Sequence, residues 1–556
     1  MNANEPQICL VAGSLQEPSG CNPAGGHFLR LARLCRTRFG SVTVLYTGPD
    51  AGLRASIERS LSSSGIHLVR LERLPLEPHD KAYWGFINQS LAVYDFLKKQ
   101  DYTHVLFQEH RGIGFRSVQA RRMAGDFQNT LLMLAIFDPS ERSLEAGETW
   151  PRWPIPAALA SWCERYVCEH ADLVVFGSDE IKRRMVENQW PVPTDNRVLP
   201  FFTDRLKSQA NLKCNRPELD PLEQEWLELF KKQAAPTNKH DVIRSKIALN
   251  PPLVSVVIAH YNHGRYLPET LASLEKSAYP NFEVIVVDDG STDGFSLRVF
   301  HELQEQYPAP RYTFIAKSKN QGIGASRNHG AALAKGDYLV FVDADNIVLP
   351  EMLESFIEGI ELSGVDCCTC FYKAFEDRPD PLRIPWVVTP AGQAMEAGWV
   401  EDVFGDANCI VRRQVFLALQ GFPEVLLLAE DWEFFINLSR SGYKLDVIPR
   451  FLFWYRDNPT GCRRSGSRYQ KYKAILDAYA SGLPEFYRRI LKQIAYPLAS
   501  DSGYPPQRWL WHELEENLKM EHRSLVQFTY FIIKQIEQFV RRKYLYRIRF
   551  NRRKPR

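Results

Sequence analysis

The sequence predicts an α/β protein with two successive α/β units and a helical region at the carboxyl terminus. Short apolar runs alternate with stretches of helical spacing, and two clusters of acidic residues directly follow apolar runs. The chain has 556 residues, which corresponds to about three structural units at roughly 100–200 residues each. Apolar residues make up 45% and charged residues 24%, a balance that can fill hydrophobic cores.

We divide the chain into residues 1–203, 204–250, 251–480 and 481–556. The first segment is predicted to form a Rossmann-like layer sandwich, because short apolar runs alternate with helical stretches such as Ala82–Lys99. Gly25 and Gly26 precede a helix predicted from His27, where they form either a tight turn or an anion-binding helix start. The predicted strands are Ile8–Ala12, Val42–Tyr46, His67–Arg70, His104–Phe107, Leu131–Phe137 and Asp172–Phe176.

The second α/β unit is predicted to begin after a polar linker. Residues 204–250 contain several prolines and one predicted helix, Leu222–Gln233. Strands are then predicted at Val254–Ala259, Glu283–Val287, Tyr312–Ala316 and Tyr338–Val342, with helices near Pro268–Lys276, Leu297–Gln306 and Ala325–Ala334.

The remaining features bear on location. The start of the chain has no signal-peptide pattern, and no run of about 18 apolar residues occurs, so we expect a cytoplasmic protein. Cys367, Cys368 and Cys370 alternate with apolar residues, which favours strand packing over a zinc site. Residues 525–556 combine helical apolar spacing with a basic tail. They form either a peripheral membrane contact or a packed helix with a solvated tail.

Two acidic clusters point to the chemistry. The segment Asp288–Asp293 (DDGSTD) follows the apolar run Val284–Val287, and Asp343-Ala344-Asp345 follows Tyr338–Val342. Ligands of open α/β sheets bind at the carboxyl ends of strands. Carboxylates there can hold a divalent metal that binds phosphate, or accept hydrogen bonds from a base or ribose. The pattern therefore indicates a nucleotide diphosphate compound as the ligand.

Residues 252–460 resemble glycosyltransferase family 2, the inverting enzymes of GT-A fold. Five motifs in family order carry the resemblance: VSVVIAHYN at 254–262, DDGSTD at 288–293, NQGIGASRN at 320–328, DAD at 343–345 and AEDW at 429–432. The resemblance implies that Asp345, assisted by Asp343, holds Mg²⁺ or Mn²⁺. It also implies that Asp431 deprotonates the acceptor hydroxyl, with Glu430 tuning its pKa or positioning the acceptor.

The resemblance also implies donor contacts. Tyr261 would stack on the base and Asp289 would accept from the base or ribose, while Arg327 would approach phosphate oxygens or the base. Asp343 would belong to the same nucleotide-sugar site, and Asp406 and Asn408 would contact the donor sugar or the acceptor. The alternatives are core packing for Tyr261, a surface ion pair for Arg327, turn residues for Asp406 and Asn408, a solvated turn for the DAD triplet and helix capping for Glu430 and Asp431.

Two further segments allow predictions. Trp454–Arg456 and Arg463–Arg468 form either a mobile basic flap over the diphosphate or a charged surface loop. Residues 1–203 resemble the first half of family 4 transferases of GT-B fold, through Phe107–Gly114, Ala135–Ser140 and Glu164–Ser178. No second half follows, so we hypothesise a half-domain used for acceptor binding or partner docking.

The predicted function is inverting transfer of a sugar from a nucleotide-diphosphate sugar, UDP-linked by resemblance, to a glycan or lipid-linked acceptor in surface polysaccharide biosynthesis. One alternative is a scaffold without turnover. Another is a nucleotidyltransferase, which needs a glycine-rich basic loop after the first strand, whereas His260–Arg265 contains one glycine. We expect no nucleic-acid partner, because the basic charge of the carboxyl-terminal tail is the one feature that favours nucleic-acid binding.

Overall fold

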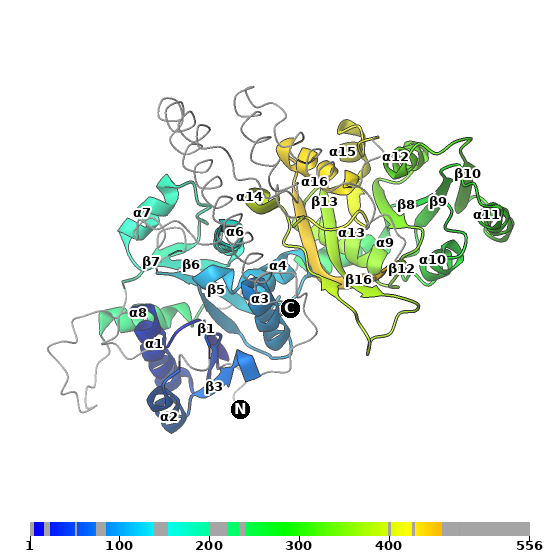
Figure 1. The fold of residues 1–556 in the computed structure, drawn as a ribbon. Helices are drawn as coiled ribbons and strands as arrows, with labels where there is room; N and C mark the ends of the chain where they lie inside the picture. The colour runs from blue at the N-terminus through cyan, green and yellow to red at the C-terminus, as the bar shows by residue number, and fades with distance from the viewer. Residues whose placement is uncertain are drawn as a thin grey trace, which may run out of the picture.

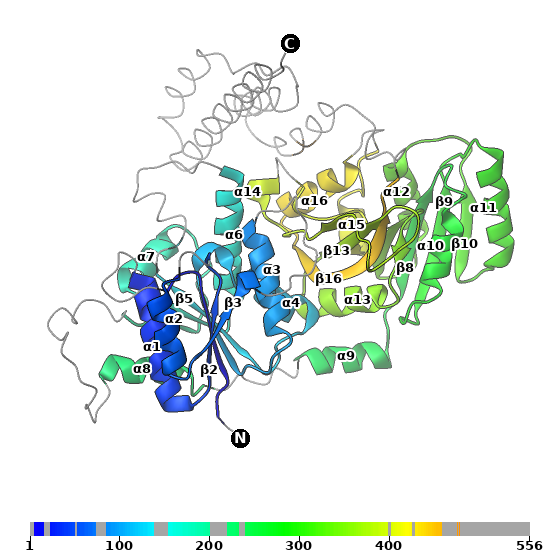
Figure 2. The same cartoon turned by 60° about the horizontal axis from the view of Figure 1, so that its bottom comes forward.

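The computed structural model describes residues 5–15, 23–49, 53–73, 85–137, 139, 154–200, 220–232, 239–398, 402–424, 429–458, 475 and 478. Two sheets with their helices lie next to each other (Figures 1 and 2). The predicted α/β class is confirmed for both units. The helical region predicted at 481–556 lies outside the described residues.

The amino-terminal sheet is entirely parallel among the described residues, in the order β3-β2-β1-β4-β5-β6-β7. This is the order expected of a Rossmann-like fold. Alternate residues of β1 enter opposite cores: Cys9 packs with α3, α4 and α6, and Leu10 packs with α1, α2 and α8. The strands are β1 Ile8–Ala12, β2 Val42–Tyr46, β3 His67–Arg70, β4 His104–Gln108, β5 Leu131–Ile136, β6 Leu173–Phe176 and β7 Asn196–Val198.

The helices of this unit are α1 Pro23–Phe39, α2 Ala55–Ser63, α3 Gly85–Leu97, α4 Phe115–Ala124, α6 Pro154–His170 and α7 Asp179–Glu187. The predicted start of α1 at His27 is wrong, because the helix begins at Pro23 and takes Gly25 and Gly26 into its first turns. A proline at the first position suits a helix start, since its missing N–H has no partner there anyway. The two glycines therefore do not form a turn in front of the helix.

The segment predicted as a linker contains two packed helices. The helix α8 (Pro221–Leu229) lies on the amino-terminal sheet, where Trp226 is fully buried. The helix α9 (Lys239–Leu249) lies against α13 of the second unit. The helix α9 was not predicted from the sequence, because it has few apolar residues and several charged ones.

The second sheet follows the order β10-β9-β8-β11-β15-β13-β16-β12, with β14 paired to β13. The strands β10, β9, β8 and β11 are parallel, and β15 pairs antiparallel with β11. The strands are β8 Val254–His260, β9 Phe282–Asp288, β10 Tyr312–Ala316, β11 Tyr338–Asp343, β12 Ile347–Val348, β13 Cys367–Phe375, β14 Val387–Val388, β15 Ile410–Arg412 and β16 Leu445–Arg456. The helices are α10 Leu267–Leu274, α11 Gly294–Gln306, α12 Ile323–Leu333, α13 Met352–Ser363, α14 Met395–Gly398, α15 Arg413–Ala418 and α16 Glu430–Arg440.

The two units share a buried interface centred on Asp446 of β16, which is 2% exposed. Its carboxylate accepts hydrogen bonds from Gln119 at 2.9 Å, Arg122 at 2.5 Å and Tyr166 at 2.7 Å, all from the amino-terminal unit. Arg116, also fully buried, donates to the Thr389 carbonyl at 2.7 Å. One apolar core continues from α4 and α6 to α14 and α16 (Figure 2). The amino-terminal unit is therefore part of the packing that supports the second unit.

We expect Asp446→Ala to destabilise the protein by about 3–5 kcal/mol, because Arg122 and its neighbours lose their buried acceptor. Chemical denaturation of the full chain measures this. Glu180→Ala is the matched control: its ion pair with Arg184 is about half exposed on both sides, so it should change stability by no more than roughly 0.5 kcal/mol. Equal stability of the two variants would contradict a supporting interface.

Candidate active site

The loop after β8 meets the loop after β9 at the carboxyl edge of the parallel strands. Asn262 adopts a left-handed conformation with φ of 52°. Its side-chain oxygen accepts from the backbone N–H groups of Thr292 at 2.8 Å and Asp293 at 3.2 Å. Tyr261, next to it, is 39% exposed. Core packing of Tyr261 is therefore wrong, and its ring is free to stack on a base, which stays a prediction.

Asp289 anchors the segment that leads into α12. Its carboxylate accepts from the Gln321 and Gly322 backbone N–H groups at 3.0 and 2.8 Å and from Lys317 Nζ at 2.6 Å. The adjacent Gly290, with φ of 70°, lies so close to the Lys319 backbone that a Cβ would clash at 2.6 Å. Asp289 is thus charge-compensated and fixed, and its predicted contact with a base or ribose is untested.

Arg327 of α12 joins the two acidic motifs. Its guanidinium donates to Asp343 at 2.6 Å and to Glu430 at 2.7 Å, and the residue is 2% exposed. The two carboxylates hold the pKa of Arg327 above its ordinary value despite burial. The surface ion pair considered from the sequence is therefore wrong. Glu430 is thus ion-paired with Arg327, and its role in the reaction stays a prediction.

Asn408 extends this network toward Asp406. The Asn408 side chain accepts from the Asp343 backbone N–H at 3.1 Å and donates to the Asp343 carboxylate at 3.2 Å. Asp406 accepts from the Asn408 backbone at 2.9 Å and also from its amide group. Burial, followed by the charge of Asp343, raises the pKa of Asp406 to about 6. Asn408 is 1% exposed, so it holds Asp343 in place, and direct sugar contact by either residue stays a prediction.

The negative charge of the Asp345 carboxylate is only weakly compensated by nearby positive groups. Burial, followed by repulsion from Asp343, raises its pKa to about 7. Arg456 lies behind this loop, donating to the Asp345 backbone carbonyl at 3.0 Å and to Glu269 at 2.6 Å. Arg456 is 5% exposed and ends β16, so Trp454–Arg456 form neither the mobile flap nor the charged surface loop considered from the sequence. Residues 463–468 lie outside the described part of the chain.

The residues at the DAD triplet fit a divalent cation. Asp345 and Asp343 offer carboxylate oxygens, the ligands that Mg²⁺ and Mn²⁺ prefer. Within the described ranges, no three His, Cys, Asp or Glu side chains form a metal cluster on their own. A cation here would keep coordination positions for water and phosphate oxygens, as is usual for Mg²⁺ bound by one or two carboxylates. The three cysteines at 367–370 are buried in β13, as the strand-packing prediction expected.

Asp431 lies in the first turn of α16, following Ala429, which has an unusual φ of 106°. Burial raises the pKa of Asp431 well above 3.8, and the charges of Glu430, Asp402 and Asp406 add to this, while Arg327 opposes it. Both acids favour the helix dipole, and each accepts a backbone N–H at the helix start: Glu430 from Ala429 at 3.2 Å and Asp431 from Trp432 at 2.8 Å. Both acids therefore help to cap the helix, and a carboxylate with a raised pKa also suits a general base, which stays a prediction.

Hydrogen bonds join five of the nine predicted residues in one network: Asp343, Asp406, Asn408, Arg327 and Glu430. Asp345 and Asp431 interact with this network through charge, whereas Asp289 bonds Lys317 and the start of α12, and Tyr261 is exposed. Four residues that fix the surrounding loops were not predicted from the sequence. Lys317 bonds Asp289, Asn262 bonds the loop after β9, and Glu269 accepts from Arg456. The fourth is His263, whose pKa is lowered by burial although the charge of Asp343 opposes this. Asn262 belongs to the motif at 254–262, which was the one signal available. The others make contacts across long sequence distances that no local pattern encodes.

We expect Arg327→Met to destabilise the protein by about 3–5 kcal/mol, because Asp343 and Glu430 would lose the charge that compensates them. Arg327→Lys should recover part of the loss, since one ammonium cannot reproduce two separate guanidinium contacts. Denaturant midpoints measure both. Arg298→Met is the control, because its pair with Glu302 is 63% and 65% exposed. A fully stable Arg327→Met variant would show that the bridge is unimportant.

Comparison with known proteins assigns the second unit. The glycosyl transferase family 2 model matches residues 255–419. The putative glycosyltransferase EpsE of Bacillus subtilis is 36% identical over 231 residues, which cover 40% of this chain and 80% of EpsE. The chain belongs to glycosyl transferase family 2. The uncharacterized glycosyltransferase MJ1057 of Methanocaldococcus jannaschii is 28% identical over 219 residues, 37% of this chain and 72% of that protein.

The match covers part of several family 2 relatives. The uncharacterized glycosyltransferase EpsJ of Bacillus subtilis is 29% identical over 218 residues. The matched part covers 37% of this chain and 62% of EpsJ. Solved structures include S. aureus TarS 1–349 in complex with UDP-GlcNAc, with 18% identity, a TM-score of 0.36, and coverage of 52% of this chain and 91% of that one. The family model lies within the second unit, and the resemblance of residues 1–203 to half a GT-B enzyme is not confirmed.

Proposed function

We propose that this family 2 protein transfers a sugar from a nucleotide-diphosphate sugar, UDP-linked, to a hydroxyl of a glycan or lipid-linked acceptor, with inversion at the anomeric carbon. The observation that carries the proposal is the hydrogen-bonded series from Asp406 through Asn408, Asp343 and Arg327 to Glu430. This series holds the predicted metal-binding loop and the predicted base together at the edge of the sheet where ligands bind.

The proposed reaction has one proton transfer and one displacement. Asp431 accepts the proton of the acceptor hydroxyl as its oxygen forms a bond to the anomeric carbon. The bond from that carbon to the diphosphate oxygen breaks, and the nucleoside diphosphate leaves with the electron pair. A divalent cation held by Asp345 and Asp343 would act as a Lewis acid on the diphosphate. Tyr261 and Asp289 bind the nucleoside, and Arg327 and Asn408 keep Asp343 oriented.

The biological setting is also a proposal. We propose surface polysaccharide biosynthesis on the cytoplasmic side, with residues 1–203 binding the acceptor or a partner and residues 525–556 contacting the membrane peripherally. No helix within the described ranges is long and apolar enough to span a bilayer. Flotation of full-length protein and residues 1–520 with anionic liposomes tests the membrane contact. Equal binding by the two proteins would exclude a role for the tail.

The transfer reaction is tested by incubating the protein with Mn²⁺, a panel of nucleotide sugars and candidate acceptors. Acceptor-dependent release of nucleoside diphosphate is expected for one donor class. NMR of the product should show an anomeric configuration opposite to that of the donor. Release of pyrophosphate would indicate nucleotidyl transfer instead. No release with any donor and acceptor would favour the non-catalytic scaffold.

A further inference from the structure

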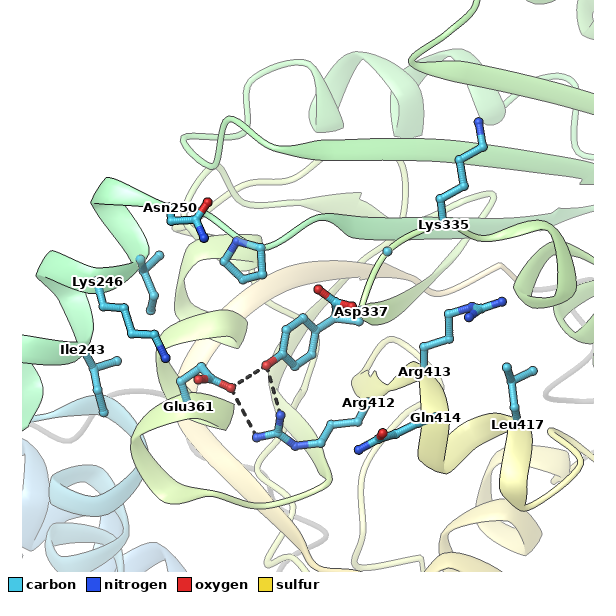
Figure 3. A pocket seen from close by; sticks show the side chains of 14 residues that line it. Ile243, Lys246, Asn250, Lys335, Asp337, Glu361, Arg412, Arg413, Gln414 and Leu417 are labelled. Atoms are coloured by element: carbon cyan, nitrogen blue, oxygen red, sulfur yellow. Dashed lines mark hydrogen bonds and ion pairs between the residues drawn. The ribbon is translucent and has the colours of Figure 1, made fainter.

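A cavity lies at the edge of the sheet opposite the candidate active site, where β8 and β11 begin. It has a volume of about 700 Å³, within the size range of ligand pockets. Its walls come from the end of α9, the turn before β11, α13 and the junction of β15 with α15 (Figure 3). The candidate active site lies at the carboxyl ends of the same strands, so the two sites do not overlap.

One side of this pocket is fixed by hydrogen bonds. Tyr338 donates its hydroxyl to Glu361 and accepts from Arg412 at 3.0 Å, and Arg412 also contacts Glu361 at 3.3 Å (Figure 3). Arg412 additionally donates to the Val365 carbonyl at 3.2 Å. This triad neutralises Arg412 and Glu361 and gives the pocket a rigid wall, so neither residue supplies a free charge to a ligand.

Three other cations surround the pocket without an acid to pair with in the described part of the chain. Lys246 comes from α9 on one side of the cavity, and the exposed Lys335 and the half-buried Arg413 come from two other segments on the opposite side (Figure 3). Their side chains make no hydrogen bond or ion pair with any residue in the described ranges, and the buried Nε of Arg413 lacks an acceptor there. A buried N–H without a partner destabilises the protein, so an anion that draws this guanidinium into a hydrogen bond would remove that cost.

Asp337 limits which anions fit. It is the one remaining acid in the lining, it is exposed, and its carboxylate makes no ion pair with a described residue. A carboxylate repels a bare phosphate but accepts hydrogen bonds from hydroxyl groups. Three cations that no described acid neutralises, together with one acceptor, therefore favour a molecule that carries both a phosphate and hydroxyl groups.

We propose that this pocket binds a phosphate ester rich in hydroxyl groups, such as a sugar phosphate. The phosphate contacts Lys335 and Arg413, Lys246 adds attraction from the α9 side, and Asp337 accepts from a hydroxyl. The proposal does not depend on the transfer reaction, because none of these residues belongs to the candidate active site.

Titration calorimetry of the full-length protein with glucose 6-phosphate tests this. We expect glucose 6-phosphate to bind at one site. Its affinity should fall at high salt, because salt screens exposed charges. The double variant Lys335→Gln/Arg413→Gln should bind at least about tenfold more weakly, a loss of about 1.4 kcal/mol. Lys276→Gln, an exposed lysine outside the pocket, should bind like wild type. Thermal melting checks that every variant is folded.

Two further measurements distinguish this pocket from the nucleotide site and from a lipid-binding surface. Asp345→Ala, saturated with UDP, should keep glucose 6-phosphate binding, and loss there would place the ligand in the nucleotide site and overturn the proposal. Asp337→Asn should weaken glucose 6-phosphate relative to inorganic phosphate. Absence of binding at millimolar ligand, or binding of phosphatidylglycerol vesicles through Lys335 and Arg413 without glucose 6-phosphate binding, would also overturn it.

Discussion

Asp345→Ala is expected to lower sugar transfer by at least about a thousandfold. Lewis-acid stabilisation of a leaving diphosphate supplies several kcal/mol, and each 1.36 kcal/mol is a factor of ten in rate. Asp345 is the carboxylate of the DAD triplet whose charge is least compensated by its neighbours, whereas Asp343 already bonds Arg327 and Asn408. Asp345 should therefore be the main protein ligand of the cation.

The measurement combines turnover with binding. In Asp345→Ala we expect Mn²⁺ to lose its effect on UDP affinity, while UDP still binds weakly through Tyr261 and Asp289. Stability should not fall, because burial disfavours the charged form that the substitution removes. Asp241→Ala, whose side chain is 86% exposed on α9, is the control. Turnover by Asp345→Ala that still depends on Mn²⁺ would contradict the assignment.

Most of the parallel strands of both sheets were predictable because they are short apolar runs, the majority of them buried. The strand β7, with the sequence NRV and no fully buried residue, was not predicted. The prediction failed where a strand lacks that pattern. The strand β16 (Leu445–Arg456) mixes one proline, two arginines and several aromatic residues, so its basic end was interpreted as either a flap or a surface loop. Its identity comes from tertiary contacts: it pairs with β13, and Arg456 lies over the rings of Tyr266 and Phe375.

The site was predictable as a set of residues but not as a network. The resemblance placed Arg327 and Glu430 in one site, yet they are 103 residues apart, and their 2.7 Å contact has no local signature. The same holds for Asp446, whose partners in the amino-terminal unit are about 280–330 residues away. Sequence patterns report which elements form, whereas the bonds that fix acids in position depend on how distant elements pack.

Asp431→Asn is expected to lower transfer by about 10²–10⁴-fold, the usual contribution of a general base. The carboxylate is active only when ionised, and burial together with Glu430, Asp402 and Asp406 raises its pKa well above 3.8. Wild-type activity should therefore fall, as pH decreases, at a pH clearly above the ordinary range of an aspartate. The pH profile of kcat/KM measures this limb.

The variant Asp406→Asn shows which carboxyl group causes the acid limb of the pH profile. Asp406 has a pKa raised to about 6 and also lies close enough to raise that of Asp431. Removing its charge should shift the acid limb to lower pH but leave it in place. In Asp431→Asn the residual rate should show no such limb. An unchanged limb in Asp431→Asn would mean that another group is the base.

Stability should move opposite to activity. Because the folded-state pKa of Asp431 is above its unfolded value, ionising this carboxyl at neutral pH costs folding free energy. Asp431→Asn should therefore raise the melting temperature at pH 7, and the gain should vanish below about pH 4, where the unfolded carboxyl is also protonated. If Asp431 is a catalytic carboxylate held among like charges, the substitution should lower turnover and raise stability. If Asp431 only caps the helix, the substitution should lower stability and leave turnover nearly unchanged.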